Sequence, residues 1–176
     1  MAISKTVDSV LRPISECPIQ AYLSNQLQVA DVVEWCLDQM TGEATIRQTS
    51  FSISEEFIRR LYHLRQAGKV TDIRLLLDYK ATNKTLRLWP FIAQTIDKCF
   101  LADNHSKLIL VESPGMRVAI ITSQNLTRGN RHECAVVTTV PEVFDTLAQE
   151  FDDLMTRHSV PLSELLKSKL CQSLSI

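Results

Sequence analysis

The sequence predicts a layered α/β/α domain with a mixed β-sheet, formed by residues 1–176 as a single domain. In the first half of the chain, segments with helical spacing alternate with short apolar runs of strand length. In the second half, three strand candidates lie too close together for helical crossovers, so antiparallel pairing is expected there. A chain of this length buries roughly two-thirds of its unfolded surface, which is enough for a self-sufficient core.

The N-terminal segment, residues 1–40, is expected to be helical. Between residues 23 and 40, apolar residues recur three or four positions apart, which predicts an amphipathic helix. Gly42 suits the end of that helix, because glycine readily takes the left-handed conformation that closes helices. ATIRQTSF, residues 44–51, is rich in β-branched residues and partly alternating, so it predicts a strand.

A second helix, a second strand and an interrupted helix are expected next. Residues 52–68 open with Ser52 in a capping-box pattern, carry an apolar stripe and end on a glycine. DIRLLLDY, residues 72–79, is an apolar run that predicts a buried strand. Residues 81–100 return to helical spacing, but Pro90 should split this segment or begin its second half.

Three strands and two helices are expected in the second half. The strand candidates are KLILVE, RVAIITS and ECAVVTT, which begin at residues 107, 117 and 133. Pro141 suits the first turn of the last major helix. The tail, residues 159–176, is expected to form a leucine-rich helix that either packs on its own domain or grips a second subunit as an arm.

Composition and charge exclude several classes of protein. The formal net charge is −1, so a polyanion has to be held by a local basic patch and not by the overall field. The five cysteines are widely spread and show no zinc-ligand spacing, so reduced thiols and no metal or other cofactor are expected. Because no segment has the pattern of a signal peptide or a membrane span, we expect a cytoplasmic protein that does not enter the membrane.

Two polar pairs stand at the ends of neighbouring strand candidates. Residues i and i+2 of a strand leave the same face, so His105 and Lys107 would point together, and so would Ser123 and Asn125. Lysine supplies charge, and hydroxyl and amide donors supply directed hydrogen bonds, so these groups suit one phosphate. His105 is then left for covalent or proton-transfer work. The alternative is that His105 and Lys107 are only the solvated end of a strand.

These residues resemble the signature of the phospholipase D superfamily, HxKxxxxD followed by GSxN. The matching residues are His105, Lys107, Glu112, Ser123 and Asn125. Glu112 stands where the family usually has Asp, a position that is mostly structural, and Thr122 stands where it usually has Gly, which adds a Cβ beside the phosphate site. The resemblance spans residues 104–137 and implies a phospholipase D-like fold.

The resemblance also implies roles for the site residues. In the family, one histidine attacks phosphorus to give a phosphohistidine and a second histidine protonates the leaving oxygen. This chain has one His-x-Lys pair, at His105, which implies a homodimer with its active site on the two-fold axis. Glu133 resembles the acidic residue that orients the catalytic histidine. Two lysines and the polar donors take the place of a divalent metal, so activity is expected to be metal-independent.

The function expected is therefore that of a phosphodiesterase, most plausibly a nuclease that acts on DNA or RNA alone or within a larger defence or repair assembly. Basic residues near the motif would line a phosphate-tracking groove, unless they are scattered solubilising charge; they are Lys84, Arg87, Arg117, Arg128 and Arg131. Two alternatives stay open: a non-catalytic nucleic-acid-binding or assembly subunit, and a phospholipase or phosphatidyl transferase.

Overall fold

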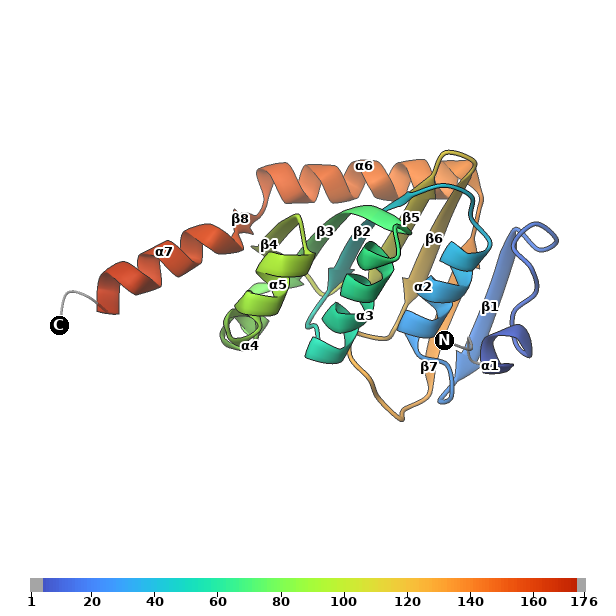
Figure 1. The fold of residues 1–176 in the computed structure, drawn as a ribbon, viewed down its shortest axis with the longest axis horizontal. Coiled ribbons are helices and arrows are strands. Elements are labelled where there is room, and N and C mark those ends of the chain that lie inside the picture. Colours follow the sequence, from blue (N-terminus) through green and yellow to red (C-terminus); the bar gives the residue numbers. More distant parts are fainter. Residues whose placement is uncertain (1–4, 174–176) are drawn as a thin grey trace.

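A mixed sheet of eight strands runs through the computed structural model, which describes residues 5–173 and, of these, the side chains of residues 7–167 (Figure 1). The strands are β1 (Ile19–Ser24), β2 (Ala44–Ser50), β3 (Val70–Asp78), β4 (Lys98–Ala102), β5 (Leu108–Ser113), β6 (Met116–Thr122), β7 (Glu133–Thr138) and β8 (Val160–Pro161). The helices are α1 (Lys5–Asp8), α2 (Val29–Asp38), α3 (Glu55–Gln66), α4 (Thr82–Arg87), α5 (Trp89–Thr95), α6 (Pro141–Arg157) and α7 (Leu162–Ser173), with a 3₁₀ turn η1 (Tyr79–Ala81).

The strand order is β1-β7-β6-β5-β2-β3-β4-β8. β2, β3 and β4 are parallel to one another, and their connections run through helices, as parallel pairing requires. β5, β6 and β7 form an antiparallel meander, and β5 pairs antiparallel with β2. The mixed sheet predicted from the spacing of the segments is therefore confirmed.

Helices cover both faces of the sheet. In Figure 1, α2, α3 and α5 lie in front of the strands, where their apolar side chains share a core cluster with Ile46, Ile73 and Ile109. The opposite face packs against α6, since Leu76 clusters with Phe151 of that helix. Because neighbouring residues of a strand face opposite sides, one strand contributes to both cores. This arrangement confirms the predicted α/β/α layering.

The N-terminal segment is not wholly helical, and this prediction is wrong. Residues 19–24 form β1, which pairs antiparallel with β7 along its length. Tyr22 is buried while Leu23 is 73% exposed, which is the alternation of an edge strand and not the stripe of a helix. The helix starts only at Val29, after the extended residue Gln28.

Two further boundaries differ from the predictions. The segment 81–100 contains β4 at its end, which was expected to be helical; Leu101 is fully buried there beside β3. The helix α3 is capped by Ser54 and not by Ser52, because the Ser54 hydroxyl accepts a hydrogen bond from the Phe57 N–H at 3.3 Å.

The tail begins by packing on its own domain. Leu162 is fully buried, and Leu165 packs against the same core as α2 and α3. Beyond this first turn, α7 points away from the sheet (Figure 1). The arm was predicted from five leucines, at 162, 165, 166, 170 and 174; the last two lie outside the described side chains, so the arm stays a prediction.

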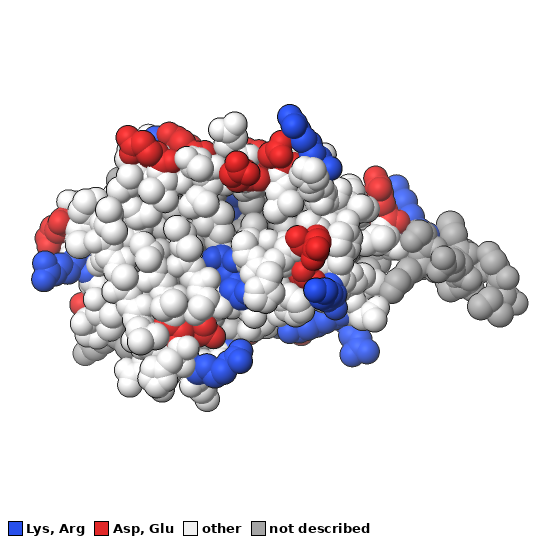
Figure 2. Space-filling model, turned by 180° about the vertical axis from the view of Figure 1, so that it is seen from behind, with Lys and Arg blue, Asp and Glu red and all other residues white. Residues whose placement is uncertain are grey.

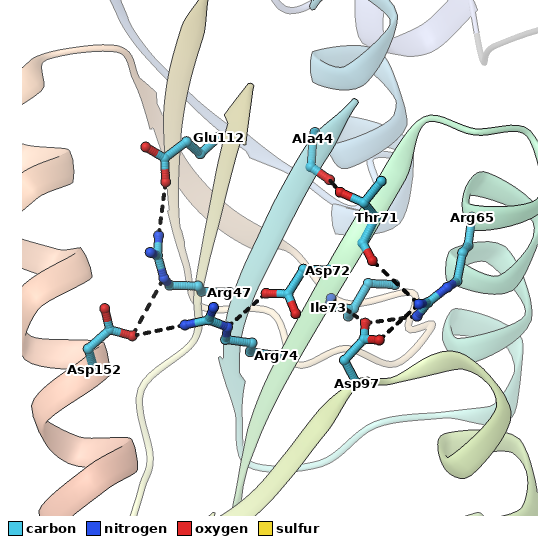
Figure 3. Close-up of polar contacts among 10 residues, drawn as sticks. All are labelled: Ala44, Arg47, Arg65, Thr71, Asp72, Ile73, Arg74, Asp97, Glu112 and Asp152. Carbon is cyan, nitrogen blue, oxygen red and sulfur yellow. Dashed lines mark hydrogen bonds and ion pairs between the residues drawn. The ribbon is translucent and has the colours of Figure 1, made fainter. Parts of the chain in front are cut away.

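Arg65 and Asp97 fasten α3 to the sheet (Figure 3). The Arg65 guanidinium donates to both carboxylate oxygens of Asp97 at 2.8 Å, and the Ile73 N–H of β3 donates to the same carboxylate at 2.8 Å. Burial alone would raise the pKa of Asp97. The hydrogen bonds from Arg65 and Ile73, together with the Arg65 charge, outweigh burial and hold this pKa below its usual value.

Replacing Asp97 with Asn should therefore lower the free energy of unfolding by about 1 kcal/mol at neutral pH, a value discounted because both side chains are about 30% exposed. A carboxyl group whose pKa is lower in the folded state than in the unfolded state stabilises the folded state. This stabilisation is complete above the pKa of the unfolded state, about 4, and is lost as the pH falls through the lower pKa of the folded state. Urea unfolding of Asp97→Asn and wild type across pH 2–7 measures the difference in their free energies of unfolding. The difference should be largest at neutral pH and shrink below about pH 4.

The matched control is Glu55→Gln, which removes a pair with Arg59 whose side chains are 42% and 61% exposed. It should cost no more than about 0.5 kcal/mol. Equal losses in the two variants, or a difference for Asp97→Asn that grows on acidification, would contradict this account of the α3 anchor.

Candidate active site

Several loops meet at one edge of the sheet. β5 is antiparallel to β2 and to β6, and β7 is antiparallel to β6, so the ends of β2 and β6 and the starts of β5 and β7 all lie at this edge. His105 and Lys107 precede β5, while Ser123 and Asn125 follow β6. The topology of the sheet thus brings the two sequence motifs together.

His105 and Lys107 lie in a loop and not in a strand, so the predicted strand geometry of this pair is wrong: β5 begins only at Leu108. The pair is nevertheless in contact. The Lys107 ammonium donates to the His105 carbonyl at 2.8 Å and lies 3.5 Å from Nδ1 of the His105 ring. The imidazole is exposed and Lys107 is half-buried, which suits a group that must reach a substrate.

Hydrogen bonds tie this loop to the ends of β2 and β3. Asn104 is 95% buried; its N–H donates to Asp78 at 3.0 Å, and its side-chain amide donates to the Ser50 carbonyl at 3.4 Å. The Ser106 N–H donates to the Asn104 side chain at 3.2 Å, and the hydroxyls of Ser106 and Thr49 are 2.8 Å apart. Because Asn104 and Ser106, on either side of His105, both have partners on strands, the backbone at His105 is held in place.

Asn125 is held by the same end of β2. Its side-chain oxygen accepts a hydrogen bond from the Phe51 N–H at 3.2 Å and lies 3.2 Å from the Ser50 hydroxyl, whose single proton is shared with the Ser52 carbonyl at 2.8 Å. The Ser50 hydroxyl also accepts from the Leu126 N–H at 3.1 Å. Since the amide oxygen faces β2, the amide nitrogen of Asn125 is directed elsewhere and remains a donor for a ligand.

The partner of Ser123 is Glu133. The Ser123 hydroxyl donates to the Glu133 carboxylate and accepts from the Cys134 N–H at 3.1 Å. Glu133 was expected to orient His105; in the described contacts its hydrogen bond goes to Ser123, although both residues line the same hollow. Thr122 donates to the Cys134 carbonyl at 3.0 Å, so its side chain links β6 to β7.

All four motif side chains open into one hollow. Its volume is about 510 Å³, and it is lined by Phe51, His105, Lys107, Ser123, Asn125, Arg131, His132 and Glu133. A second hollow of about 800 Å³ lies beneath α6 and shares His105, Lys107 and Ser123 with the first. Those three residues therefore stand at the junction of two open spaces, where a ligand can leave in either direction.

Solved structures share this architecture. Nuc from Salmonella typhimurium, a phospholipase D family member, matches with a TM-score of 0.64 and 18% identity over 81% of this chain and 96% of that chain. This chain has the phospholipase D fold. NucT from Helicobacter pylori matches with a TM-score of 0.59 and 10% identity over 81% of this chain and 98% of that chain. The archaeal chromatin protein TrmBL2, whose structure shows a mode of DNA binding, matches with a TM-score of 0.52 and 9% identity over 88% of this chain and 58% of that chain. Comparisons with family models and with curated proteins find no match.

Glu112, the acidic residue of the first motif in this phospholipase D fold, lies at the other end of β5 from His105. Its carboxylate pairs with Arg47 of β2 at 3.2 Å (Figure 3). Arg47 and Arg74 each lie 3.6 Å from Asp152, which projects from α6 toward the sheet. Glu112 thus belongs to a charged cluster that joins α6 to β2, β3 and β5.

The basic residues that were expected to line one groove lie in different parts of the structure. Arg131 lines the hollow that contains His105. Arg128 instead points to Glu56 of α3, 3.5 Å away, and lines a different, small hollow. The prediction for Arg117 is wrong, because Arg117 is the second residue of β6 and pairs with Asp145 of α6, about 20 Å along the strand from the site. Lys84 and Arg87 lie on α4 and line neither hollow at the site.

The described residues include neither a cluster of metal ligands nor a membrane-spanning helix. Among them, no group of three or more His, Cys, Asp or Glu side chains is placed to hold a metal ion. None of the helices in the described part of the chain is both long and apolar enough to span a membrane.

Several residues that build the site carry no motif and were missed from the sequence: Thr49, Ser50, Phe51, Asp78 and Asn104. Each follows or ends a strand, and the polar residues among them hydrogen-bond to the motif loops. The only signal in the sequence is their place at strand ends, which many ordinary polar residues share.

Ser50→Ala should lower the free energy of unfolding by about 1–3 kcal/mol, because the Leu126 N–H would be left buried without its partner. It should also free the Asn125 side chain, whose amide signals in NMR spectra would broaden or split. Ser113→Ala is the matched control: this serine is also buried, but it lies at the far end of β5. Unchanged Asn125 signals in Ser50→Ala would show that β2 does not position this residue.

Proposed function

We propose that this chain is a metal-independent phosphodiesterase that cleaves DNA or RNA and uses His105 as its nucleophile. The observation that carries the proposal is that His105, Lys107, Ser123 and Asn125 line one hollow at the edge of the sheet. An ammonium, a hydroxyl and an amide N–H are together suited to the non-bridging oxygens of a phosphate. The shared fold with a DNA-binding chromatin protein supports a nucleic acid as the ligand.

The reaction would proceed in two displacements. In the first, the lone pair of the His105 ring nitrogen Nε2 forms a bond to phosphorus, the P–O bond to the leaving group breaks, and a second histidine gives its proton to the leaving oxygen. In the second, that histidine, now neutral, takes a proton from water. The hydroxide formed attacks phosphorus and the N–P bond breaks, which restores the enzyme.

Phosphate binding would rearrange the polar contacts of the site. Ser123 donates its hydroxyl proton to Glu133, and Lys107 donates to the His105 carbonyl. A phosphate that takes both donors leaves the Glu133 carboxylate free to accept the Nδ1 proton of His105. With the proton held at Nδ1, the lone pair sits on Nε2, where attack requires it.

The second histidine would come from a second copy of the chain. Apolar side chains are exposed on the sheet face beside Ser123, on three adjoining strands; they are Ile19, Leu23, Ile121 and Val136. Seen from behind, the region below α6 carries few charged side chains, whereas acidic ones gather along α6 at the top (Figure 2). A partner that covers this apolar face would remove it from water and bring its own His105 toward the same phosphate.

His105→Ala should reduce cleavage of a fluorescent single-stranded oligonucleotide by at least ~1,000-fold while binding is kept, since the nucleophile is lost and Lys107 stays. Wild-type cleavage should persist in EDTA. His63→Ala, on the exposed side of α3, is the control and should cleave like wild type. A reduction well below ~1,000-fold in His105→Ala, or loss of wild-type cleavage in EDTA, would refute the mechanism. If the wild type cleaves no oligonucleotide, a non-catalytic nucleic-acid-binding role is favoured.

Mixing wild-type and His105→Ala subunits tests the shared site. If each site needs one histidine from each subunit, activity after subunit exchange follows the square of the wild-type fraction, so an equal mixture retains about a quarter of the activity. His132 lines the same hollow and is the alternative source of the proton. If His132 served within one subunit, the equal mixture would retain about half, and the dimeric site would be wrong.

A further inference from the structure

Phe51 is the phenylalanine that lies outside the apolar cores. The chain has six phenylalanines, all of them in the described part. The other five lie in the apolar clusters or pack directly against them; they are Phe57, Phe91, Phe100, Phe144 and Phe151. Phe51 is half-buried, belongs to none of these clusters, and lines the hollow of the candidate active site. An aromatic ring that does not serve a core but borders a site is available to a ligand.

The ring of Phe51 is held beside His105. Its centroid lies 5.8 Å from that of the imidazole, with the two planes at 60°. The Phe51 N–H donates to the Asn125 side chain at 3.2 Å, so its backbone is fixed by the second motif. If a phosphate is bound between His105 and Asn125, the base of the nucleotide that carries it can therefore reach the phenyl ring.

Charge distinguishes the two hollows that meet at His105. The hollow with Phe51 carries Lys107, Arg131 and His132 on its wall against one acidic group, Glu133. The hollow beneath α6 carries Glu150 and Asp153.

His158 also lines that second hollow and lies 3.9 Å from Asp153, and the rest of its wall is largely apolar, with Leu147 and Leu154 of α6. A polyanionic strand that leaves the reacting phosphate is attracted toward Arg131 and repelled by Glu150 of α6, whereas Asp153 is paired with Arg157 at 2.9 Å. The strand is therefore directed over Phe51.

We propose that Phe51 is a stacking platform for a nucleobase of a single-stranded substrate; this rests on the proposed function, since the ligand is taken to be a nucleic acid. Every base has an aromatic face, so stacking there would add affinity without sequence preference. A base in a duplex is already stacked and paired, so it would have to leave the helix to reach the ring. Unpaired strands are accordingly the favoured substrate class.

A binding measurement tests the platform independently of cleavage. It uses the His105→Asn protein, which keeps a polar side chain next to Phe51, and fluorescence anisotropy with two single-stranded oligodeoxynucleotides of equal length, one with bases and one abasic throughout. The base-bearing strand should bind about 10-fold more tightly. Adding Phe51→Leu should remove this preference, and Phe51→Trp should keep or increase it. Phe91→Leu, the same change at a phenylalanine of α5, should leave it unaltered.

Equal affinity for the two strands in the His105→Asn protein would overturn the platform. So would a Phe51→Leu variant that weakens both strands equally, because the ring would then only support the His105 loop. Failure of the wild type to cleave any oligonucleotide would refute the proposed phosphodiesterase activity instead. The binding comparison would still decide the role of Phe51, so the two failures are distinguishable.

Discussion

The end of β2 anchors both motif loops at once. Thr49 holds the loop before β5, Ser50 holds Asn104 on one side and Asn125 on the other, and the Phe51 N–H completes the contact with Asn125. Ser50 is fully buried, so these bonds form where water cannot compete for them. Two segments about twenty residues apart in sequence are thereby fixed to one point, and the groups they carry face a common space.

The ion pairs that join the layers and the exposed side chains of the candidate site lie in different parts of the sheet. Away from the site, half-buried arginines on β2 and β3 and carboxylates on β5 and α6 join the layers (Figure 3). At the site, His105, Ser123 and Arg131 are exposed, and their neighbours are loops. The candidate site is thus exposed to water, while the ion pairs that join the layers lie away from it.

The sequence predicted the layering and the pairing of its second half because the strands KLILVE and RVAIITS are short, apolar and close together. It misplaced the N-terminal strand because Leu23 and Leu27 fall four residues apart, and that spacing fits a helix; only pairing with β7 makes 19–24 a strand. The spacing of His105, Lys107, Ser123 and Asn125 was sufficient to predict that these four side chains lie together, since β5 and β6 are adjacent in chain and in space. The contributions of Ser50, Phe51 and Asp78 come from strands distant in sequence, and no local pattern marks them.

Both motif loops are proposed to converge on a single phosphate, and an NMR titration with inorganic phosphate tests this convergence most directly. Signals from His105, Lys107, Ser123 and Asn125 should shift together along one binding curve, with Ser123 and Glu133 separating as phosphate takes the hydroxyl. Shifts confined to one loop, or different dissociation constants for the two loops, would show that the groups do not share one ligand and would contradict the account.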